Sequence, residues 1–138
     1  MKVILLSGSK GSGKSTLLRK LSSTLSNNYN IKPQNLSIVN FNPGTDICQL
    51  FDIISINKKI VIFSEGDYSK KDRVKMNTVL KIQTILNIHT DCNVLICAGQ
   101  TNNGVDLEIK EYFTKGVTDV EFKEFKINLL DEILDEIN

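Results

Sequence analysis

Eight residues near the N-terminus combine glycine, lysine and hydroxyl side chains at a spacing that suits phosphate binding. Residues 8–15 read Gly-Ser-Lys-Gly-Ser-Gly-Lys-Ser, which matches the pattern G-x-x-x-x-G-K-[ST]. Glycines let a loop curl until several backbone N–H groups point inward and form a nest for an anion. A helix that starts directly after such a loop adds the partial positive charge of its N-terminus. The segment therefore predicts a site for the phosphates of a nucleotide.

The end of this segment carries functional groups for a bound nucleoside triphosphate. The Lys14 ammonium can reach the β- and γ-phosphates, and the Ser15 hydroxyl can coordinate Mg²⁺. We expect Lys14 to be mostly solvated when no nucleotide is bound. The residues expected to bind the nucleotide are Gly8, Ser9, Lys10, Gly11, Ser12, Gly13, Lys14, Ser15 and Thr16.

The setting of the segment carries a family resemblance. It lies between a short apolar run at residues 3–6 and a run with leucines at helical spacing. In that setting the sequence resembles the P-loop NTPases, and residues 11–16 (Gly-Ser-Gly-Lys-Ser-Thr) are most like the small kinase-like members. The resemblance is specific over residues 3–25. Over the rest of the chain it extends only to the order of the predicted strands and helices. It implies ATP and Mg²⁺ as cofactors and a catalytic role for Lys14.

Lys10 adds a second cation to the loop. Partition-type ATPases of this superfamily carry a signature lysine five positions before the motif lysine. Lys10 lies four positions before Lys14, so it departs from that pattern. We interpret Lys10 as an additional contact to phosphate or to solvent.

An acidic turn after the apolar run 60–63 supplies the candidate metal-binding and base groups. The resemblance implies an acidic residue after such a strand, and the usual aspartate position is Ser64 or Glu65 in this chain. Glu65 or Asp67 could hold Mg²⁺ through water or act as a base toward an attacking oxygen. Glu65 is the stronger candidate, and the alternative for Asp67 is an exposed turn residue.

Polar residues in three other loops are weaker candidates. Asn40, Asn42 and Asp46 follow the second predicted strand, where related kinases place acidic groups against the acceptor, but the Asn-Pro-Gly sequence there favours a simple turn. Residues 100–102 (Gln-Thr-Asn) either sense phosphate or solvate a loop. His89 is interpreted as a helix C-terminal residue without a catalytic role.

Apolar runs that alternate with helical patterns organise the chain. Predicted strands cover residues 3–6, 36–41, 60–63, 93–98 and 119–127. Predicted helices cover residues 15–26, 69–87, 105–115 and a C-terminal segment that Asn128 caps, and a short helix is assigned near 47–51. This alternation predicts one domain over residues 1–138 of the three-layer α/β class, with about five mainly parallel strands and helices on both faces. Ligands of such sheets bind beyond the C-terminal ends of the strands.

Composition and charge exclude several classes of protein. Hydrophobic residues make up 41% and charged residues 24%, as in a soluble domain, and a net charge of +1 does not indicate nucleic acid or an anionic membrane as partner. Residues 1–105 carry 13 Lys/Arg and 6 Asp/Glu, whereas residues 106–138 carry 4 and 10. This asymmetry indicates either a solvated acidic C-terminal helix or a basic part that faces a polyanion such as a nucleotide.

The three cysteines and the absence of a long apolar run bear on location. Cys48, Cys92 and Cys97 form no Cys-x-x-Cys pair, so a disulfide framework or a thiolate zinc site is not expected. We predict buried or idle thiols in a reducing cytoplasm. No run approaches the 18 apolar residues of a membrane helix.

Three functions remain open at this point. The first is phosphoryl transfer from ATP to a small acceptor, the second is an ATPase that is slow or activated by a partner protein that supplies an arginine, and the third is nucleotide binding without turnover. With only Arg19 and Arg73, the chain lacks the arginines of a kinase lid, and the lack of an aspartate at either candidate position, 64 or 65, favours the third function. GTPase motifs are absent, so ATP is preferred, and a full AAA-type module is set aside as longer than this chain.

Overall fold

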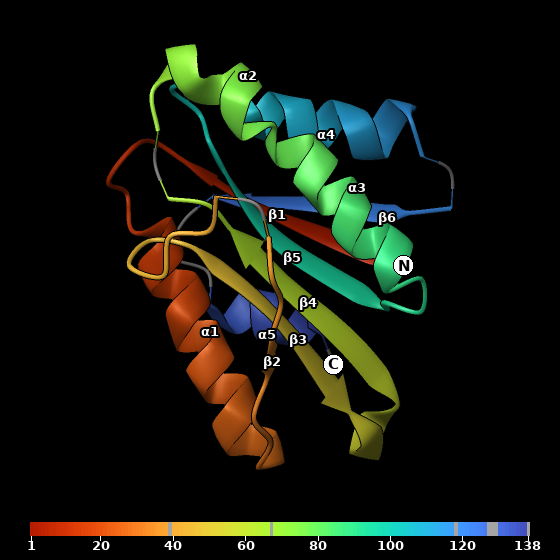
Figure 1. Ribbon diagram of the computed structural model, residues 1–138. Helices are drawn as coiled ribbons and strands as arrows, with labels where there is room; N and C mark the ends of the chain where they lie inside the picture. Colours follow the sequence, from red (N-terminus) through yellow and green to blue (C-terminus); the bar gives the residue numbers. More distant parts are fainter. Residues whose placement is uncertain (39, 67, 118, 127–129, 138) are drawn as a thin grey trace.

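The computed structural model describes residues 1–38, 40–66, 68–117, 119–126 and 130–137, and for residues 130–132 it describes the backbone alone. The strands are β1 (Lys2–Gly8), β2 (Gln34–Asn35), β3 (Ile47–Ile53), β4 (Lys58–Ser64), β5 (Val94–Gln100) and β6 (Glu121–Lys126). The helices are α1 (Lys14–Tyr29), α2 (Arg73–Met76), α3 (Thr78–Ile88), α4 (Val105–Lys115) and α5 (Leu130–Ile137), with 3₁₀ turns η1 (Ile54–Ile56) and η2 (Lys70–Asp72). Figure 1 shows their arrangement.

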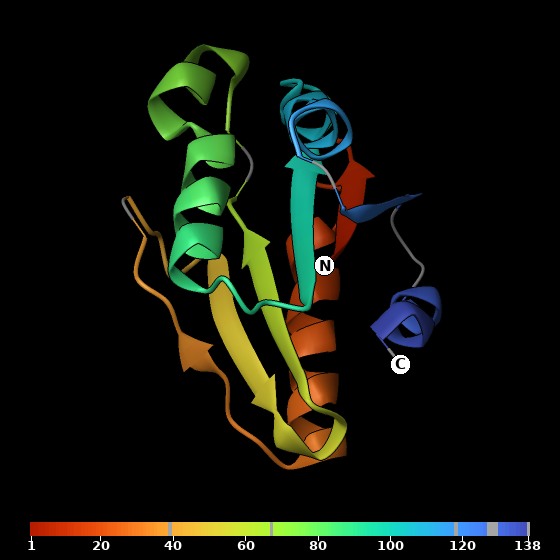
Figure 2. The same ribbon diagram turned by 90° about the vertical axis from the view of Figure 1, so that its right-hand side faces the viewer.

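The strands form one mixed sheet that is covered on both faces. Its order is β2-β3-β4-β5-β1-β6. The strands β4, β5, β1 and β6 are parallel, and β3 runs antiparallel to both of its neighbours. Helices α1 and α5 pack on one face, and α3 and α4 pack on the other (Figures 1 and 2). The predicted three-layer α/β fold is confirmed, with six strands in the described part of the chain and β3 as the antiparallel one.

Strand β1 lies between β5 and β6, and its burial accounts for the apolar run near the N-terminus. Residues 3–6 are fully buried. Ile4 and Leu6 face the core beneath α1, and Val3 and Leu5 face the core beneath α3 and α4. A strand that is buried on both faces needs apolar residues at every position. Because β1 lies inside the sheet, the residues that follow it leave the sheet at the C-terminal ends of the parallel strands.

Two predictions for residues 36–57 are wrong. The stretch 36–41 was expected to be the second strand, but among its described residues, which exclude Val39, strand pairing does not extend beyond Leu36, whose N–H donates to the Cys48 carbonyl next to β2. The stretch near 47–51 was expected to be a short helix, but it is the strand β3. Five of its seven residues are buried and they face both sides of the sheet, so the sequence lacks the clear alternation that distinguishes a strand from a helix in a short apolar run.

The helix expected over residues 69–87 is interrupted. The chain forms η2 and α2 before α3 begins. Asn77 separates α2 from α3 with φ +42°, and its side chain accepts a hydrogen bond from the Leu80 N–H at 3.3 Å. Asparagine tolerates this left-handed conformation and caps helices well, so α3 starts independently of the segment before it.

The C-terminal third follows the sequence pattern more closely. Helix α4 covers the predicted residues 105–115, and β6 is an edge strand within the predicted 119–127. In α5, Ile133 and Ile137 are buried, as predicted. The predicted cap Asn128 and the side chain of Leu130 lie outside the described residues. No helix in the described ranges is both long and apolar enough to cross a lipid bilayer.

Gly99 near the end of β5 permits a close approach of α4. A Cβ at this position would lie 2.7 Å from the Asp106 Cα and 2.9 Å from its backbone nitrogen. We expect Gly99→Ala to lower the free energy of unfolding by about 2 kcal/mol, the usual cost of overpacking, in urea denaturation. The control is Gly44→Ala, because a Cβ there meets only the Asn42 Oδ1, at 3.3 Å. Equal unfolding midpoints for the two variants would contradict the close approach.

Candidate functional site

Residues 9–13 form a tight loop between β1 and α1, as the motif predicts. Gly11 and Gly13 have φ +72° and +93°, where side chains are strained. Gly8 is required for a different reason, because a Cβ there would lie 2.5 Å from the Ser12 Oγ. The Ser12 N–H donates to the Ser9 carbonyl at 3.1 Å and closes the turn. The glycines therefore permit the curvature that an anion nest needs.

The side chain of Lys14 is folded over this loop. Its residue exposure is 6%, and its Nζ donates to the Ser9 carbonyl at 2.8 Å and to the Ser12 Oγ at 3.5 Å. The expectation of a mostly solvated Lys14 is therefore wrong. The reason is that the curled loop brings the Ser9 carbonyl oxygen within hydrogen-bonding distance of the long Lys14 side chain.

The remaining loop residues are more open. Thr16 and Lys10 are exposed, and Ser15 is half-buried in the first turn of α1. The backbone N–H of Lys10 donates to the Asn102 Oδ1 at 2.8 Å, and the Thr101 N–H donates to the Gly8 carbonyl at 2.9 Å. The sequence left two roles open for the loop after β5, sensing of phosphate or solvation. These two hydrogen bonds show that the loop packs against the P-loop and supports it.

The Glu65 carboxylate is buried against α3. Its side chain is 2% exposed, its Oε1 accepts from the Thr78 hydroxyl at 2.7 Å, and its Oε2 pairs with the Lys81 ammonium at 2.5 Å. Side chains alternate along β4, so Phe63 and Glu65 face α3 while Ser64 faces the α1 side. Thr78 and Lys81 were not predicted from the sequence. Their only sequence signal is a polar pair three positions apart in a largely apolar helix.

A second set of polar groups joins Glu65 to the end of β5; Tyr68 and Asn103 were not predicted, whereas Gln100 was a weaker candidate. The Tyr68 hydroxyl lies 2.6 Å from the Thr78 Oγ1, and the Tyr68 N–H donates to the Gln100 Oε1 at 3.3 Å. The Asn103 Nδ2 donates to the same Gln100 oxygen at 3.1 Å and to the Tyr68 carbonyl at 3.0 Å. Burial raises the pKa of Tyr68 to about 12, with a further rise from the nearby Glu65 charge, so its hydroxyl stays protonated at neutral pH.

A small cavity lies between the P-loop lysine and the candidate base. Its volume is about 10 Å³, which is room for about one water molecule. The residues around it are Lys14, Glu65, Gly66, Tyr68, Thr78, Ala98, Gln100, Asn103 and Val105. The structure thus brings Lys14 and Glu65 to the lining of one small cavity, although they are far apart in the sequence.

The oxygen donors near the P-loop suit Mg²⁺ rather than a softer metal. Mg²⁺ is commonly held by one or two protein oxygens, several waters and the phosphates of its nucleotide. Ser15 offers a hydroxyl, and the Glu65 carboxylate keeps lone pairs beyond those used by Thr78 and Lys81. Within the described ranges no group of three His, Cys, Asp or Glu side chains gathers as an all-protein metal site. The residues fit a metal that arrives with a nucleotide.

The loop before β3 is built as a turn. The Asn42 side chain accepts from the Gly44 N–H at 3.0 Å, and the Asp46 carboxylate accepts from the N–H groups of Asn42 and Gly66 at 2.9 and 2.7 Å. Asp46 therefore ties this turn to the residue after Glu65, as the turn interpretation expects. Asp67 lies outside the described residues. His89 is the C-cap residue that follows α3, in agreement with its predicted place at a helix C-terminus.

The two arginines lie in different settings. Arg73 pairs through its Nε with the Glu108 carboxylate at 3.0 Å, and its Nη1 donates to the Asn103 carbonyl at 3.2 Å. Arg19 is exposed in α1, where it borders a shallow depression with Thr16. Arg73 is therefore engaged in holding α2 to the start of α4.

The three cysteines are free and buried, which confirms the prediction of buried thiols. Burial raises the pKa of Cys97 to about 12 and the pKa of Cys92 to about 11. Burial, with a smaller effect of the Glu65 charge, raises the pKa of Cys48 to about 12. Thiols with such pKa values carry almost no thiolate at neutral pH and are poor nucleophiles.

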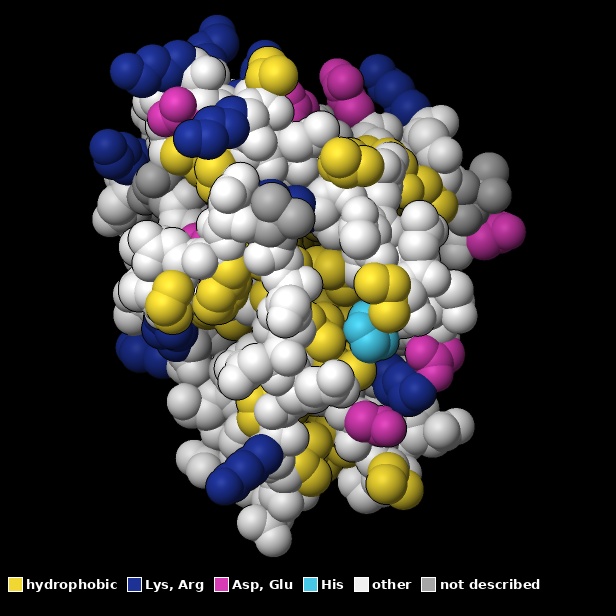
Figure 3. Space-filling model, viewed as in Figure 1, with side chains coloured by type: hydrophobic (Ala, Val, Ile, Leu, Met, Phe, Trp, Pro, Cys, Tyr) yellow, Lys and Arg dark blue, Asp and Glu magenta, His cyan; other side chains and the backbone are white. Residues whose placement is uncertain are grey.

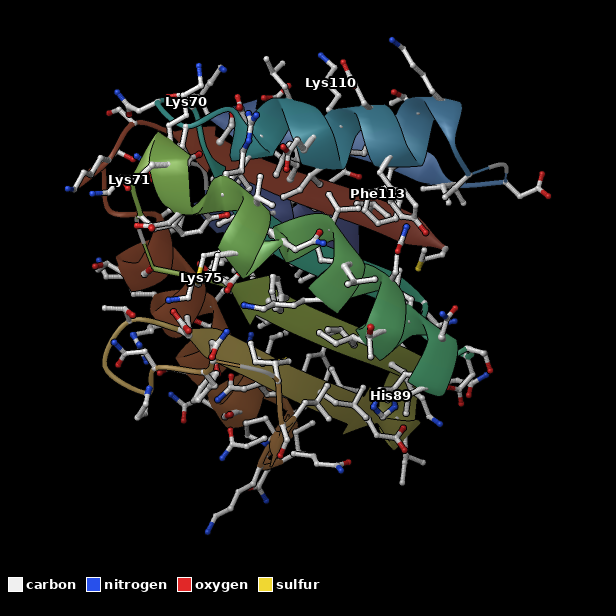
Figure 4. The ribbon with its side chains drawn as sticks, turned by 45° about the horizontal axis from the view of Figure 1, so that its top comes forward. Lys70, Lys71, Lys75, His89, Lys110 and Phe113 are labelled. Carbon is white, nitrogen blue, oxygen red and sulfur yellow. The ribbon has the colours of Figure 1, made fainter. Side chains whose placement is uncertain are left out.

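The charge asymmetry of the sequence has a structural counterpart. Lys70, Lys71 and Lys75 are exposed on η2 and α2, which follow the C-terminal end of β4, and Figures 3 and 4 show basic side chains gathered at this corner. In the acidic C-terminal part, Glu136 accepts from Lys2 at 3.0 Å and from Lys123 at 2.6 Å. These lysines, Lys123 foremost, lower the pKa of Glu136. The described part of the acidic segment is thus paired as well as solvated.

Comparison with known protein families matches residues 3–135 to the AAA domain (dynein-related subfamily). The chain belongs to this AAA family. Searches of curated proteins and of solved structures found no significant match. The match covers nearly all of the chain and includes the P-loop, the acidic turn and most of α5.

Membership in the AAA family confirms the P-loop NTPase assignment and corrects two finer predictions. The protein is a nucleotide-binding NTPase of the ATP-binding AAA type. The resemblance to small kinase-like members is not supported, and setting aside the AAA class for its length was wrong. The P-loop sequence is shared across these classes, so it carries no information on which of them the chain belongs to.

Proposed function

We propose that this AAA domain binds ATP with Mg²⁺ at the P-loop and hydrolyses it, slowly alone and faster with a protein partner. The observation that carries the proposal is the one-water cavity between Lys14 and Glu65. A water there would lie near both Glu65 and the lysine that meets the phosphates. This arrangement suits in-line attack of water on a phosphoryl group better than entry of a larger acceptor.

The roles of the residues follow from their chemistry. Gly8 to Ser12 offer the backbone nest, to which Lys10 adds a contact, and Gly13 to Thr16 begin α1. Lys14 binds and stabilises charge on the transferring phosphoryl group. Ser15 holds Mg²⁺ with Glu65 acting through water, and Mg²⁺ supplies charge neutralisation of the phosphates. Glu65 takes the proton of the attacking water, and Asp67 is the substitute candidate for that role.

The settings of the two arginines support dependence on a partner. A cation that meets the transferring phosphoryl group accelerates phosphoryl transfer by about 10³–10⁵-fold. Arg73 is paired with Glu108, and Arg19 lies on the outside of α1. Neither setting offers an arginine to the P-loop, so a second protein chain is the proposed source.

The proposed location is a reducing cytoplasm, which fits the three buried and protonated thiols.

Nucleotide titration and phosphate release test this function together. We expect isothermal titration to detect ATP binding that requires Mg²⁺ and is stronger than GTP binding. We expect slow release of inorganic phosphate from ATP and no phosphorylated product with a panel of small acceptors. Transfer to an acceptor would support a kinase instead, and binding with no turnover under any condition would support a nucleotide-binding module. No binding at millimolar ATP would refute the proposal altogether.

A further inference from the structure

Helix α3 holds the Glu65 carboxylate through both of its oxygens. Thr78 donates to Oε1 at 2.7 Å and Lys81 pairs with Oε2 at 2.5 Å. Thr78 itself is 2% exposed, and the Lys81 side chain is 10% exposed. Residues three positions apart project from the same side of a helix, so this pair approaches the carboxylate as one unit from one side of α3.

In the hydrogen bonds that lead to the Glu65 carboxylate, each hydroxyl donates toward Glu65. An ionised carboxylate only accepts hydrogen bonds, so the single Thr78 hydroxyl proton must point to Glu65. The Tyr68 hydroxyl, 2.6 Å from the Thr78 oxygen, must then donate to Thr78. The resulting chain runs from Tyr68 through Thr78 to Glu65. Such chains of buried donors orient their final acceptor more firmly than one hydrogen bond does.

The remaining surroundings leave one direction open. Several titratable or charged groups lie around the carboxylate: Lys14, Asp46, Cys48, Tyr68 and Lys81, with Arg73 and Glu108 beyond Tyr68. A carboxylate has about four lone-pair sites. Thr78 and Lys81 each take one, which leaves lone pairs for a further donor, and Glu65 is one of the residues around the one-water cavity, as is Lys14.

We propose that Thr78 and Lys81 are positioning residues that aim the Glu65 carboxylate at the one-water cavity. The inference rests on the proposed ATP hydrolysis and adds two residues of α3 to it. Neither residue belongs to the P-loop, although Thr78 borders the cavity as well as the carboxylate. Each acts by fixing the carboxylate, and an oxygen displaced by about 1 Å is enough to lower a rate by about 10²-fold.

The deciding variant is Thr78→Val, which keeps the shape of the side chain and removes the hydroxyl. We expect kcat for ATP hydrolysis to fall about tenfold while KM for ATP stays within about threefold, because positioning affects the chemical step. Thr78→Ser restores the hydroxyl and is expected to restore kcat to within about twofold. The matched control is Thr84→Val on the same helix, because the Thr84 hydroxyl bonds only to the Leu80 carbonyl of α3 among the described contacts.

Lys81 is tested by substitutions that separate its charge from its bulk. Lys81→Arg retains the cation and is expected to keep most of the activity. Lys81→Met removes it and is expected to lower kcat as Thr78→Val does, together with a loss of stability from the unpaired carboxylate. Lys75→Met is the control, since Lys75 is exposed on α2 and pairs with no residue in the part of the chain that the structure describes. Thermal melts identify any variant that does not fold.

A spectroscopic readout separates this inference from the proposed function. In the nucleotide-free protein, the ¹³C signal of the Glu65 carboxyl group, identified by its loss in Glu65→Gln, is expected to move in Thr78→Val and to return in Thr78→Ser. An unmoved signal, an unchanged kcat or a raised kcat in Thr78→Val would overturn the inference, as would an equal fall in Thr84→Val. Wild-type protein that binds ATP without turnover would instead refute the proposed hydrolysis, while the signal still reports whether Thr78 holds Glu65.

Discussion

Replacement of Glu65 by glutamine is expected to lower ATP turnover by about 10²-fold or more and to leave ATP affinity within a few-fold. Loss of a positioned base typically costs this much, whereas the P-loop that binds the phosphates is unchanged. In addition, an amide offers one acceptor oxygen where the carboxylate offers two, so either Thr78 or Lys81 would face an NH₂ group in the variant. Phosphate release measured at saturating ATP, with affinity from isothermal titration, tests both parts.

The control for this substitution is Glu111→Gln, the same chemical change at an exposed position of α4. It is expected to leave turnover and affinity unchanged. If turnover of Glu65→Gln equalled that of wild type, the role of base would move to Asp67. A fall in affinity as large as the fall in turnover would mean that Glu65 acts mainly by holding the metal and nucleotide.

Replacement of Lys14 by alanine is expected to weaken Mg-ATP binding by about tenfold or more. The ammonium meets phosphate oxygens through charge-assisted hydrogen bonds, which are stronger than neutral ones. A tenfold weaker Kd removes about 1.4 kcal/mol of ATP-induced stabilisation at saturating ligand. Because Lys14 is buried and donates to the Ser9 carbonyl, the ligand-free protein is also expected to lose about 1 kcal/mol of stability.

Urea denaturation of wild type and variant, each with and without Mg-ATP, measures both effects in one experiment. Lys20→Ala is the control, since Lys20 is an exposed lysine on α1 just beyond the P-loop. An equal ATP-induced stabilisation in wild type and Lys14→Ala would show that Lys14 does not hold the phosphates. A loss of several kcal/mol without ligand would show that Lys14 is chiefly structural.

The AAA assignment changes how the acidic turn is understood. Ser64 occupies a position at which the resemblance to P-loop proteins led us to expect an aspartate, and it faces the α1 side of the sheet. Glu65 faces α3 and is held there. We therefore propose that Ser15 and the nucleotide phosphates bind the metal and that the main role of Glu65 is to act on water.

The sequence alone was sufficient for features that depend on local rules. The P-loop at residues 8–15 could be located because backbone curvature requires glycine and phosphate requires a cation at fixed spacing. The strand β1 was predictable from a short run of apolar residues that the structure buries, and α4 and β6 were predicted over nearly the residues that they occupy. Family membership below the superfamily was not predictable from these motifs, since kinases and AAA proteins share them.

Only the tertiary structure decided the features that depend on contacts between distant segments. Strand β3 could not be recognised because burial on both faces removes its alternation. The burial of Lys14 follows from the curl of its loop, and the pairing of Glu65 with Thr78 and Lys81 follows from the packing of α3 on β4. A buried carboxylate needs donors to offset its desolvation, but which side chains supply them is set by which helix lies nearby, and no local pattern in the sequence records that.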